Sequence, residues 1–138
     1  MSGERSGLLD RGDGVRLAWR LVEGEGPTVV WLGGFMSDMA GTKAQALADW
    51  AAEEGHRYLR FDYSWHGESE GAFRDQTVTR WRADSLRVIE EKTEGPLVLV
   101  APAPDFTEKL MKPEFPPQAH EALRDDGVWF RPSEYGDP

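Results

Sequence analysis

The sequence predicts an α/β fold in which an N-terminal antiparallel hairpin is followed by mostly parallel strands. Two observations lead to this fold class. Near the N-terminus, two apolar runs flank an Asp-Gly turn, which is typical of a hairpin. Farther along, apolar runs with strand character alternate with stretches of helical character, and such alternation builds a parallel sheet with right-handed crossovers. The expected order is hairpin, strand, helix, strand, helix, strand.

The hairpin and the first parallel strand come from the N-terminal quarter of the chain. Residues 8–10 and 15–21 form the hairpin, because the second run alternates apolar and polar residues and Arg11-Gly12-Asp13-Gly14 supplies the turn. Residues 23–27 form a loop rich in glycine and proline. Residues 28–32 are a β-branched apolar run, which predicts a strand covered on both faces.

Two helices are expected on either side of a strand over residues 56–61. The first covers residues 42–54, with Thr42 as the expected cap and Gly55 as the stop signal. The second covers residues 77–93 and ends at Gly-Pro. Its buried stripe is predicted to comprise Val78, Trp81, Ser85, Leu86, Val88 and Ile89.

The last predicted strand covers residues 97–100 and is expected to be buried, because it is entirely apolar. Beyond residue 101 prolines become frequent, and short helices are expected over residues 106–111 and 117–124. We expect a single domain over residues 1–138, with a sheet core over 6–101 and a helical, aromatic tail over 102–138.

The composition excludes several classes of function. The chain has 138 residues, of which 39% are apolar and 30% charged, and this balance fits a folded domain. Its net charge of −9 repels phosphate and anionic lipid, and its apolar runs are too short to cross a bilayer, so we expect neither nucleic acid nor membrane as a partner. The absence of cysteine excludes thiolate chemistry and is typical of a cytoplasmic protein. Because the three histidines are dispersed, we expect no metal and no cofactor.

Two polar segments that follow predicted strands carry the chemistry-bearing residues. In the first, Gly33 and Gly34 end a strand, where glycines let the backbone turn with its N–H groups exposed and able to stabilise an oxyanion. In the second, the strand over 56–61 leads into Asp62-Tyr63-Ser64-Trp65-His66-Gly67-Glu68-Ser69.

Together these segments resemble the N-terminal half of an α/β-hydrolase, in particular the bacterial esterase and palmitoyl-thioesterase-like branch. The run Gly-Gly-Phe-x-Ser-Asp-Met-x-Gly-Thr-Lys-Ala carries the resemblance most specifically. It implies a truncated three-layer sandwich with a cap-like helical C-terminal segment. It also implies that Gly34 and Phe35 are an oxyanion-hole remnant, with the Phe35 N–H as donor. The turn over 62–69 is structural in that family, and Trp65 stands where a glycine is usual, so its ring either fills a gap or strains the turn.

A larger departure from the family follows the strand over residues 97–100. In the family this strand enters a Gly-x-Ser-x-Gly nucleophile elbow, but no such pentapeptide follows residues 97–100, where Ala101-Pro102-Ala103-Pro104 stands instead. The resemblance implies that the elbow, its helix and one strand have been excised. It also places the catalytic acid and histidine beyond the last residue, so no residue is assigned a catalytic role.

A replacement triad of Asp62, Ser64 and His66 is a weaker interpretation. Alternate residues of an extended segment share a face, but their side chains do not converge in the required order. We interpret this turn, and Ser37 with Asp38, as loops held by their own polar groups. Ser37, Asp38, Ser64 and His66 are expected to line any crevice beyond the strand ends.

Three functions compete on this sequence. The favoured one is a rearranged or engineered hydrolase scaffold without activity, which forms a homodimer through the edge strand Leu97–Val100 or an uncovered sheet face. The alternative is a weak carboxylesterase or thioesterase that uses the residual oxyanion loop. The third is a small-molecule binding module.

Overall fold

The computed structural model describes residues 3–34, 36–100 and 112–130. The chain divides into two compact units, Met1–Pro102 and Ala103–Pro138. The single domain over residues 1–138, with its sheet core over 6–101 and its tail over 102–138, stays a prediction. The first unit holds the whole sheet and two of the helices.

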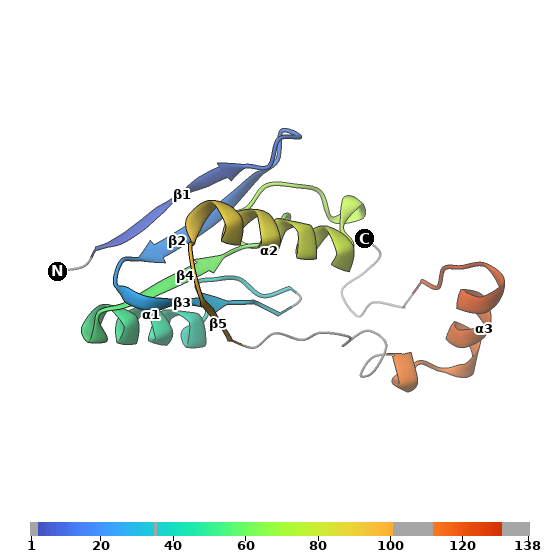
Figure 1. Cartoon of the computed structure of the whole chain (residues 1–138). Coiled ribbons are helices and arrows are strands. Elements are labelled where there is room, and N and C mark those ends of the chain that lie inside the picture. The colour runs from blue at the N-terminus through green and yellow to red at the C-terminus, as the bar shows by residue number, and fades with distance from the viewer. Residues whose placement is uncertain (1–2, 35, 101–111, 131–138) are drawn as a thin grey trace. The chain divides into compact units, whose positions relative to one another are not determined.

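A five-stranded mixed sheet forms the centre of the first unit (Figure 1). Its strands are β1 (Glu4–Asp10), β2 (Arg16–Val22), β3 (Glu25–Trp31), β4 (His56–Phe61) and β5 (Leu97–Val100), in the order β1-β2-β4-β3-β5. The pairs β1–β2 and β2–β4 are antiparallel, and β3 is parallel to both β4 and β5. The predicted hairpin followed by parallel strands is therefore confirmed.

Helices α1 (Thr42–Glu54) and α2 (Val78–Lys92) cover opposite faces of the sheet, which makes three layers (Figure 1). Alternate residues of each strand point to opposite faces, so Tyr58 packs with Ala48 and Ala51 of α1, whereas Leu59 packs with Val88 of α2. The three-layer α/β sandwich predicted from the sequence is confirmed.

The ends of the helices agree in part with the local signals. Gly55 ends α1 in the left-handed conformation with φ 74°, and Thr77 caps α2 by accepting a hydrogen bond from the Arg80 N–H. The predicted cap at Thr42 is wrong, because the N-cap of α1 is Gly41 and no side chain caps it. The glycine leaves the turn between β3 and α1 without a capping oxygen.

The predicted stripe of α2 is also wrong in part. Val78 and Leu86 are 44% and 42% exposed, while the fully buried positions are Asp84 and Val88. A carboxylate therefore occupies a buried position of the packed face that the predicted apolar stripe did not include.

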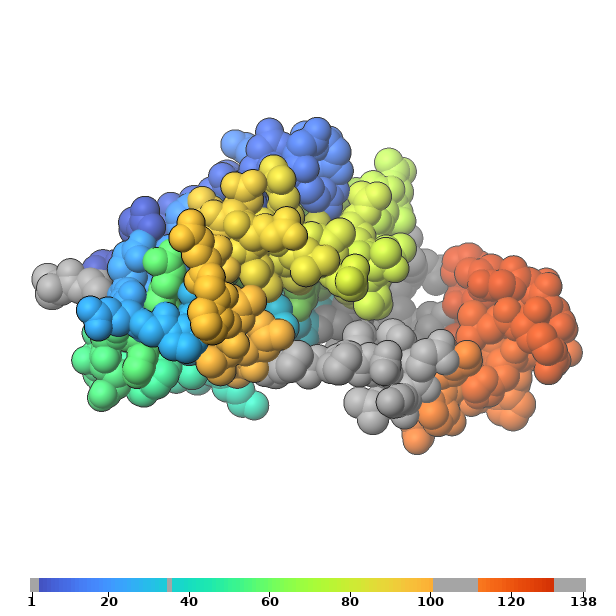
Figure 2. Space-filling model, viewed as in Figure 1, coloured from blue at the N-terminus to red at the C-terminus, as the bar shows by residue number. Residues whose placement is uncertain are grey.

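The start of β3 and the exposure of β5 differ from expectation. β3 begins at Glu25 rather than after the loop, because Glu25 pairs with His56 and a register shift before Val29 accommodates the intervening residues. The strand β5 is exposed rather than buried, with Leu97, Val98 and Leu99 at 38%, 48% and 45%. It lies at the sheet edge, where β3 is its one strand neighbour among the described residues, and Figure 2 shows it in orange at the surface.

The second unit is described over residues 112–130. It contains α3 (Pro117–Asp125), which confirms the predicted helix and carries proline at its first turn as expected. Phe115 packs against Trp129 with ring centroids 5.2 Å apart, so the aromatic residues of this unit begin a small cluster of their own. The helix predicted over residues 106–111 lies outside the described residues.

Candidate functional site

The carboxyl ends of β3 and β4 bring two polar segments together. Parallel strands end at the same edge of a sheet, so the loop over 32–41 meets the turn over 62–71. The Met36 N–H donates to His66 Nε2 at 3.1 Å, and the Met39 N–H donates to Asp62 Oδ1 at 2.8 Å. The Tyr63 hydroxyl donates to the Gly33 carbonyl at 2.8 Å. The loop with the glycine pair is thus held in place by the β4 turn.

Asp62 is buried and committed to backbone groups. Its Oδ1 accepts from Met39, and its Oδ2 accepts from the Glu68 N–H at 2.9 Å. Burial raises the pKa of Asp62, and these two hydrogen bonds oppose the rise. Gly67 is required beside it, because a Cβ there would lie 2.2 Å from Asp62 Oδ2 and the residue has φ +49°. This carboxylate therefore holds the loop over 32–41 and the turn over 62–71 together through its two hydrogen bonds.

His66 is buried beneath the loop with both ring nitrogens engaged. Because Nε2 accepts from Met36, the proton resides on Nδ1, which donates to the Ser64 carbonyl at 3.1 Å. Tyr63 and Trp81 contact the ring edge-on, with centroids 5.5 and 5.1 Å away. A general base needs an open nitrogen that faces a nucleophile, and this imidazole instead supports the backbone of the loop.

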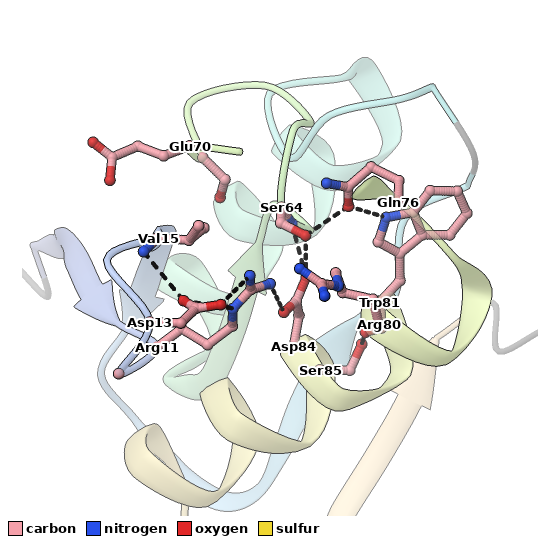
Figure 3. A network of polar contacts seen from close by, with 12 residues as sticks. Arg11, Asp13, Val15, Ser64, Glu70, Gln76, Arg80, Trp81, Asp84 and Ser85 are labelled. Atoms are coloured by element: carbon pink, nitrogen blue, oxygen red, sulfur yellow. Dashed lines mark hydrogen bonds and ion pairs between the residues drawn. The ribbon is translucent and has the colours of Figure 1, made fainter. Parts of the chain in front are cut away.

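Ser64 is the centre of a buried network (Figure 3). Its N–H and Oγ lie 2.9 and 2.7 Å from Asp84 Oδ2, and the same Oγ lies 2.7 Å from Gln76 Oε1. Asp84 Oδ1 accepts from Arg11 Nη1 at 2.8 Å. Gln76 Oε1 also accepts from Trp81 Nε1 at 2.9 Å. Ser64 and Asp84 are both fully buried, so the serine oxygen has no access to solvent.

The network extends into the hairpin turn between β1 and β2. Arg11 pairs with Asp13 at 2.7 Å as well as with Asp84, and this guanidinium lowers the pKa of Asp13 to about 2. Arg16 on β2 pairs with Glu70 at 2.9 Å and lowers the pKa of that carboxyl. The hairpin, α2 and the β4 turn are thereby joined through charged side chains.

Sequence reasoning missed Asp84 and Arg11 as members of this network. Their positions differ by 73 residues, so no local pattern connects them. One signal was present, since Asp84 lies four residues before Val88 on the same helix face and a carboxylate there needs a cationic partner. The turn residue Arg11 was the available cation.

The remaining residues of the predicted site make local contacts. Ser37 Oγ donates to the Gly34 carbonyl at 2.8 Å, and Asp38 Oδ1 accepts from the Ala40 N–H at 2.8 Å. Both contacts are the turn chemistry expected from the sequence. Phe35 lies outside the described residues, so its N–H as an oxyanion donor stays a prediction. The crevice expected around Ser37, Asp38, Ser64 and His66 also stays a prediction.

Trp65 combines the two outcomes that were expected as alternatives. Its φ of 68° lies in the left-handed region, which is costly for a residue with a side chain. Its ring packs against Phe73 with centroids 4.6 Å apart, and its N–H donates to the Glu70 carbonyl at 2.7 Å. The aromatic contact offsets the strain of a turn that is usually built on glycine.

Nucleophilic catalysis by the described residues would need a serine hydroxyl within reach of a base and of substrate. The hydroxyl of Ser64 and the ring of His66 instead contact Asp84, Gln76 and main-chain groups. Within the described ranges no group of three or more acidic, histidine or cysteine residues is arranged to hold a metal ion. No helix in those ranges is long and apolar enough to cross a membrane.

Several curated proteins that bear the same name are similar to this chain. No protein-family model matches the sequence. The mitochondrial palmitoyl-protein thioesterase ABHD10 of Bos taurus is 41% identical over 93 residues, and that of Homo sapiens is 38% identical over 93 residues. Each match covers 67% of this chain and 30% of the relative, so the chain spans about 30% of the length of these curated relatives.

Two solved structures extend this comparison. Alpha/beta hydrolase domain-containing protein 10 from mouse is 35% identical with a TM-score of 0.66, and the match covers 69% of this chain and 38% of that one. A putative hydrolase from Agrobacterium vitis S4 is 31% identical with a TM-score of 0.71. That match covers 99% of this chain and 66% of the other, so it reaches beyond the sheet into the second unit.

Proposed function

Since this chain belongs to the α/β-hydrolase superfamily, we propose that it is a catalytically silent hydrolase scaffold that associates with a second copy of itself. The observation that carries this proposal is the commitment of Ser64 and His66 to structural hydrogen bonds. A buried serine that contacts a carboxylate and an amide, beside an imidazole that supports a loop, does not form a nucleophile and its base.

The strand that precedes the missing elbow supports the same proposal. In a serine hydrolase of this superfamily a Gly-x-Ser-x-Gly turn lifts the nucleophile above the sheet. Here β5 runs into Ala101-Pro102-Ala103-Pro104 instead. The Gly-x-Ser-x-Gly sequence that the chain does contain, at residues 67–71, follows β4, where Ser69 Oγ donates to the Asp62 carbonyl at 2.7 Å and accepts from the Ala18 N–H at 2.8 Å. We propose a rearranged or engineered origin, in which downstream sequence follows β5 directly, because this strand enters the proline-rich segment where the superfamily has its elbow.

Self-association is proposed because β5 is an apolar strand at the sheet edge. Its residues Leu97 to Leu99 are between 38% and 48% exposed, and β3 is its one strand neighbour in the described part of the chain. Such an edge presents unpaired N–H and C=O groups to any compatible strand. A second copy supplies the same strand and forms a closed two-fold dimer.

A weak carboxylesterase or thioesterase is the second candidate. The names of the curated relatives describe palmitoyl-protein thioesterases, and here the Gly33–Gly34 loop is held in place by Tyr63 and His66. Oxyanion stabilisation and binding without a triad leave roughly 10³- to 10⁴-fold catalysis over water in proteases. Activity of this kind would not require a covalent intermediate.

The proposal is tested by assaying a p-nitrophenyl ester and a palmitoyl thioester, together with labelling by a fluorophosphonate probe. We expect hydrolysis at the rate of the buffer and no labelled serine, and we expect the mass of a dimer in light scattering at micromolar concentration. Ser64→Ala should leave the background rate unchanged, as should the control Ser37→Ala at an exposed turn. Saturable turnover that Ser64→Ala abolishes, or a probe on Ser64, would overturn the silent scaffold.

A cytoplasmic location is part of the proposal, on the basis of the cysteine-free composition. The curated relatives carry the word mitochondrial in their names, so the two compartments are the natural alternatives. Fractionation of cells that express the chain with an epitope tag distinguishes them, and recovery in the mitochondrial fraction would contradict the cytoplasmic assignment.

A further inference from the structure

We propose that two copies pair their β5 strands antiparallel, with the two-fold axis passing between the two Val98 residues, so that the sheets of both copies become one continuous sheet. The proposal rests on the self-association proposed above and specifies the surface, the register and the partner. It follows from the direction of the β5 backbone groups and from the order of the β5 side chains.

The backbone groups of Leu97 and Leu99 point away from the sheet. The Thr28 N–H donates to the Pro96 carbonyl at 3.1 Å, and the Leu32 N–H donates to the Val100 carbonyl at 3.2 Å. Successive residues of a strand alternate in direction, so Pro96, Val98 and Val100 face β3. The N–H and C=O groups of the two leucines therefore form the open edge.

This pattern selects a register for antiparallel pairing. In a hydrogen-bonded antiparallel pair, two opposite residues exchange both N–H···O bonds. When Leu97 lies opposite Leu99 of the second copy, every outward group of the two leucines gains a partner, and Val98 lies opposite its own copy. β5 spans only Leu97–Val100, so the pairing is limited to this short segment.

The side chains match under the same symmetry. The tripeptide Leu97-Val98-Leu99 reads identically in both directions, so antiparallel copies place equivalent residues opposite each other. Leu99 is opposite Val30, which packs on the α2 side, whereas Val98 is opposite Val29, which packs on the α1 side. Pairing therefore covers leucines with leucines on one face and Val98 with Val98 on the other.

A second copy is favoured over an unrelated strand by this symmetry. An unrelated peptide could also satisfy the outward backbone groups. It would not in general place leucine opposite leucine and valine opposite valine, as a second antiparallel Leu-Val-Leu segment does. No residue of β5 is charged, so the net charge of −9 on each copy is not concentrated at the contact. Like-charge repulsion then acts at longer range, where salt screens it.

The register is tested by single-cysteine cross-linking of the 138-residue chain, which contains no cysteine of its own. Facing residues of a non-hydrogen-bonded antiparallel pair have Cα atoms about 4.5 Å apart, within the range of a disulfide. We expect Val98→Cys to convert most of the protein into a covalent dimer under oxidised glutathione. Leu97→Cys and Leu99→Cys are the matched controls, because their own copies lie about 9 Å away and beyond disulfide reach.

A mixture of the two control variants adds a positive test. Leu97→Cys and Leu99→Cys proteins should cross-link with each other at least tenfold more than either does alone, because Leu97 faces Leu99 of the second copy. A dimer in light scattering without the Val98 cross-link would overturn the register and leave self-association standing. A monomer at micromolar concentration, with no cross-link for any variant, would overturn both proposals.

Discussion

The β4 turn and the strand β5 differ in how their polar groups are used. In the turn, Asp62, Ser64 and His66 are buried, and each contacts specific partners in neighbouring segments. In β5, the side chains are apolar and exposed, and the groups of Leu97 and Leu99 face outward. The β4 turn therefore uses the residue types of an active site for structural hydrogen bonds. The strand β5, by contrast, has outward backbone N–H and C=O groups that a further strand could pair with.

The two regions differ in which of their polar groups can still bind a partner. A buried polar group without a partner costs free energy, so the buried polar groups of the β4 turn are held in hydrogen bonds. An edge strand can leave its groups to water until another strand arrives. Substitutions in the two regions should accordingly affect different properties, namely the free energy of unfolding for the turn and the oligomeric state for β5.

The largest effect is expected from Asp84→Ala in the turn network. The substitution leaves the Ser64 N–H without its partner and removes the buried one of the two carboxylates that Arg11 contacts, and breaking a buried ion pair costs about 3–5 kcal/mol. Urea unfolding measures this loss. The control Asp13→Ala removes the exposed partner of the same arginine and should cost much less. Equal losses for the two variants would show that the buried carboxylate has no special role.

A somewhat smaller effect is expected from Gly67→Ala. The new Cβ would lie 2.2 Å from Asp62 Oδ2 at a φ of +49°, so overpacking and backbone strain together should cost about 3 kcal/mol of unfolding free energy. Gly12→Ala is the matched control, since Gly12 has φ +99° but open space around it, and should cost about 1 kcal/mol. A Gly67 variant as stable as the control would mean that Asp62 moves freely.

The strand β5 should respond in the opposite way. Leu99→Pro removes an outward N–H but keeps the ladder to β3, so self-association should weaken at least tenfold while the thermal midpoint of the monomer changes little. Val98→Pro removes an N–H that faces β3 and should lower the thermal midpoint. Light scattering and thermal unfolding of both variants separate these effects, and a Leu99→Pro protein that stays dimeric would contradict the open edge.

The smallest effect is expected for the pH dependence of stability, through Asp13 and Asp62. The pKa of Asp13 is lowered from its ordinary 3.8 to about 2, so its contribution to stability is present above pH 3.8 and is lost as the pH falls through 2. Asp62 has the opposite sign, because burial raises its pKa and its ionisation opposes folding as the pH rises. The thermal midpoint of Asp13→Asn should fall less than that of the wild type between pH 4 and 2. An identical fall would contradict the role of the Arg11 pair.

The sequence predicted those parts of the fold that depend on local signals. The Asp-Gly turn of the hairpin and the helix formers before Gly55 act within a few residues, and the structure confirms both. Composition alone predicted a buried β5, because an apolar strand has the same composition in the interior and at an edge, and the exposed edge was expected only from the family resemblance. The neighbour that decides between them comes from elsewhere in the chain or from another copy.

The candidate site was predicted in the same uneven way. The segments around Gly34 and His66 were identified, because their residue types follow strand ends. The hydrogen bond from Met36 to His66 and the pair of Arg11 with Asp84 were not, because each joins segments 30 or more residues apart. Apolar periodicity also favours hydrophobic residues at buried helix positions, so it placed no aspartate in the core.

The most direct measurement is residue-resolved amide hydrogen exchange at a dilute and a concentrated protein sample. The amides of Met39, Ser64 and Glu68 should exchange slowly in both samples, because their partners Asp62 and Asp84 lie within one copy. The amides of Leu97 and Leu99 should exchange rapidly in the dilute sample and slowly in the concentrated one. Fast exchange in the turn, or exchange in β5 that does not depend on concentration, would contradict a committed turn and an open strand.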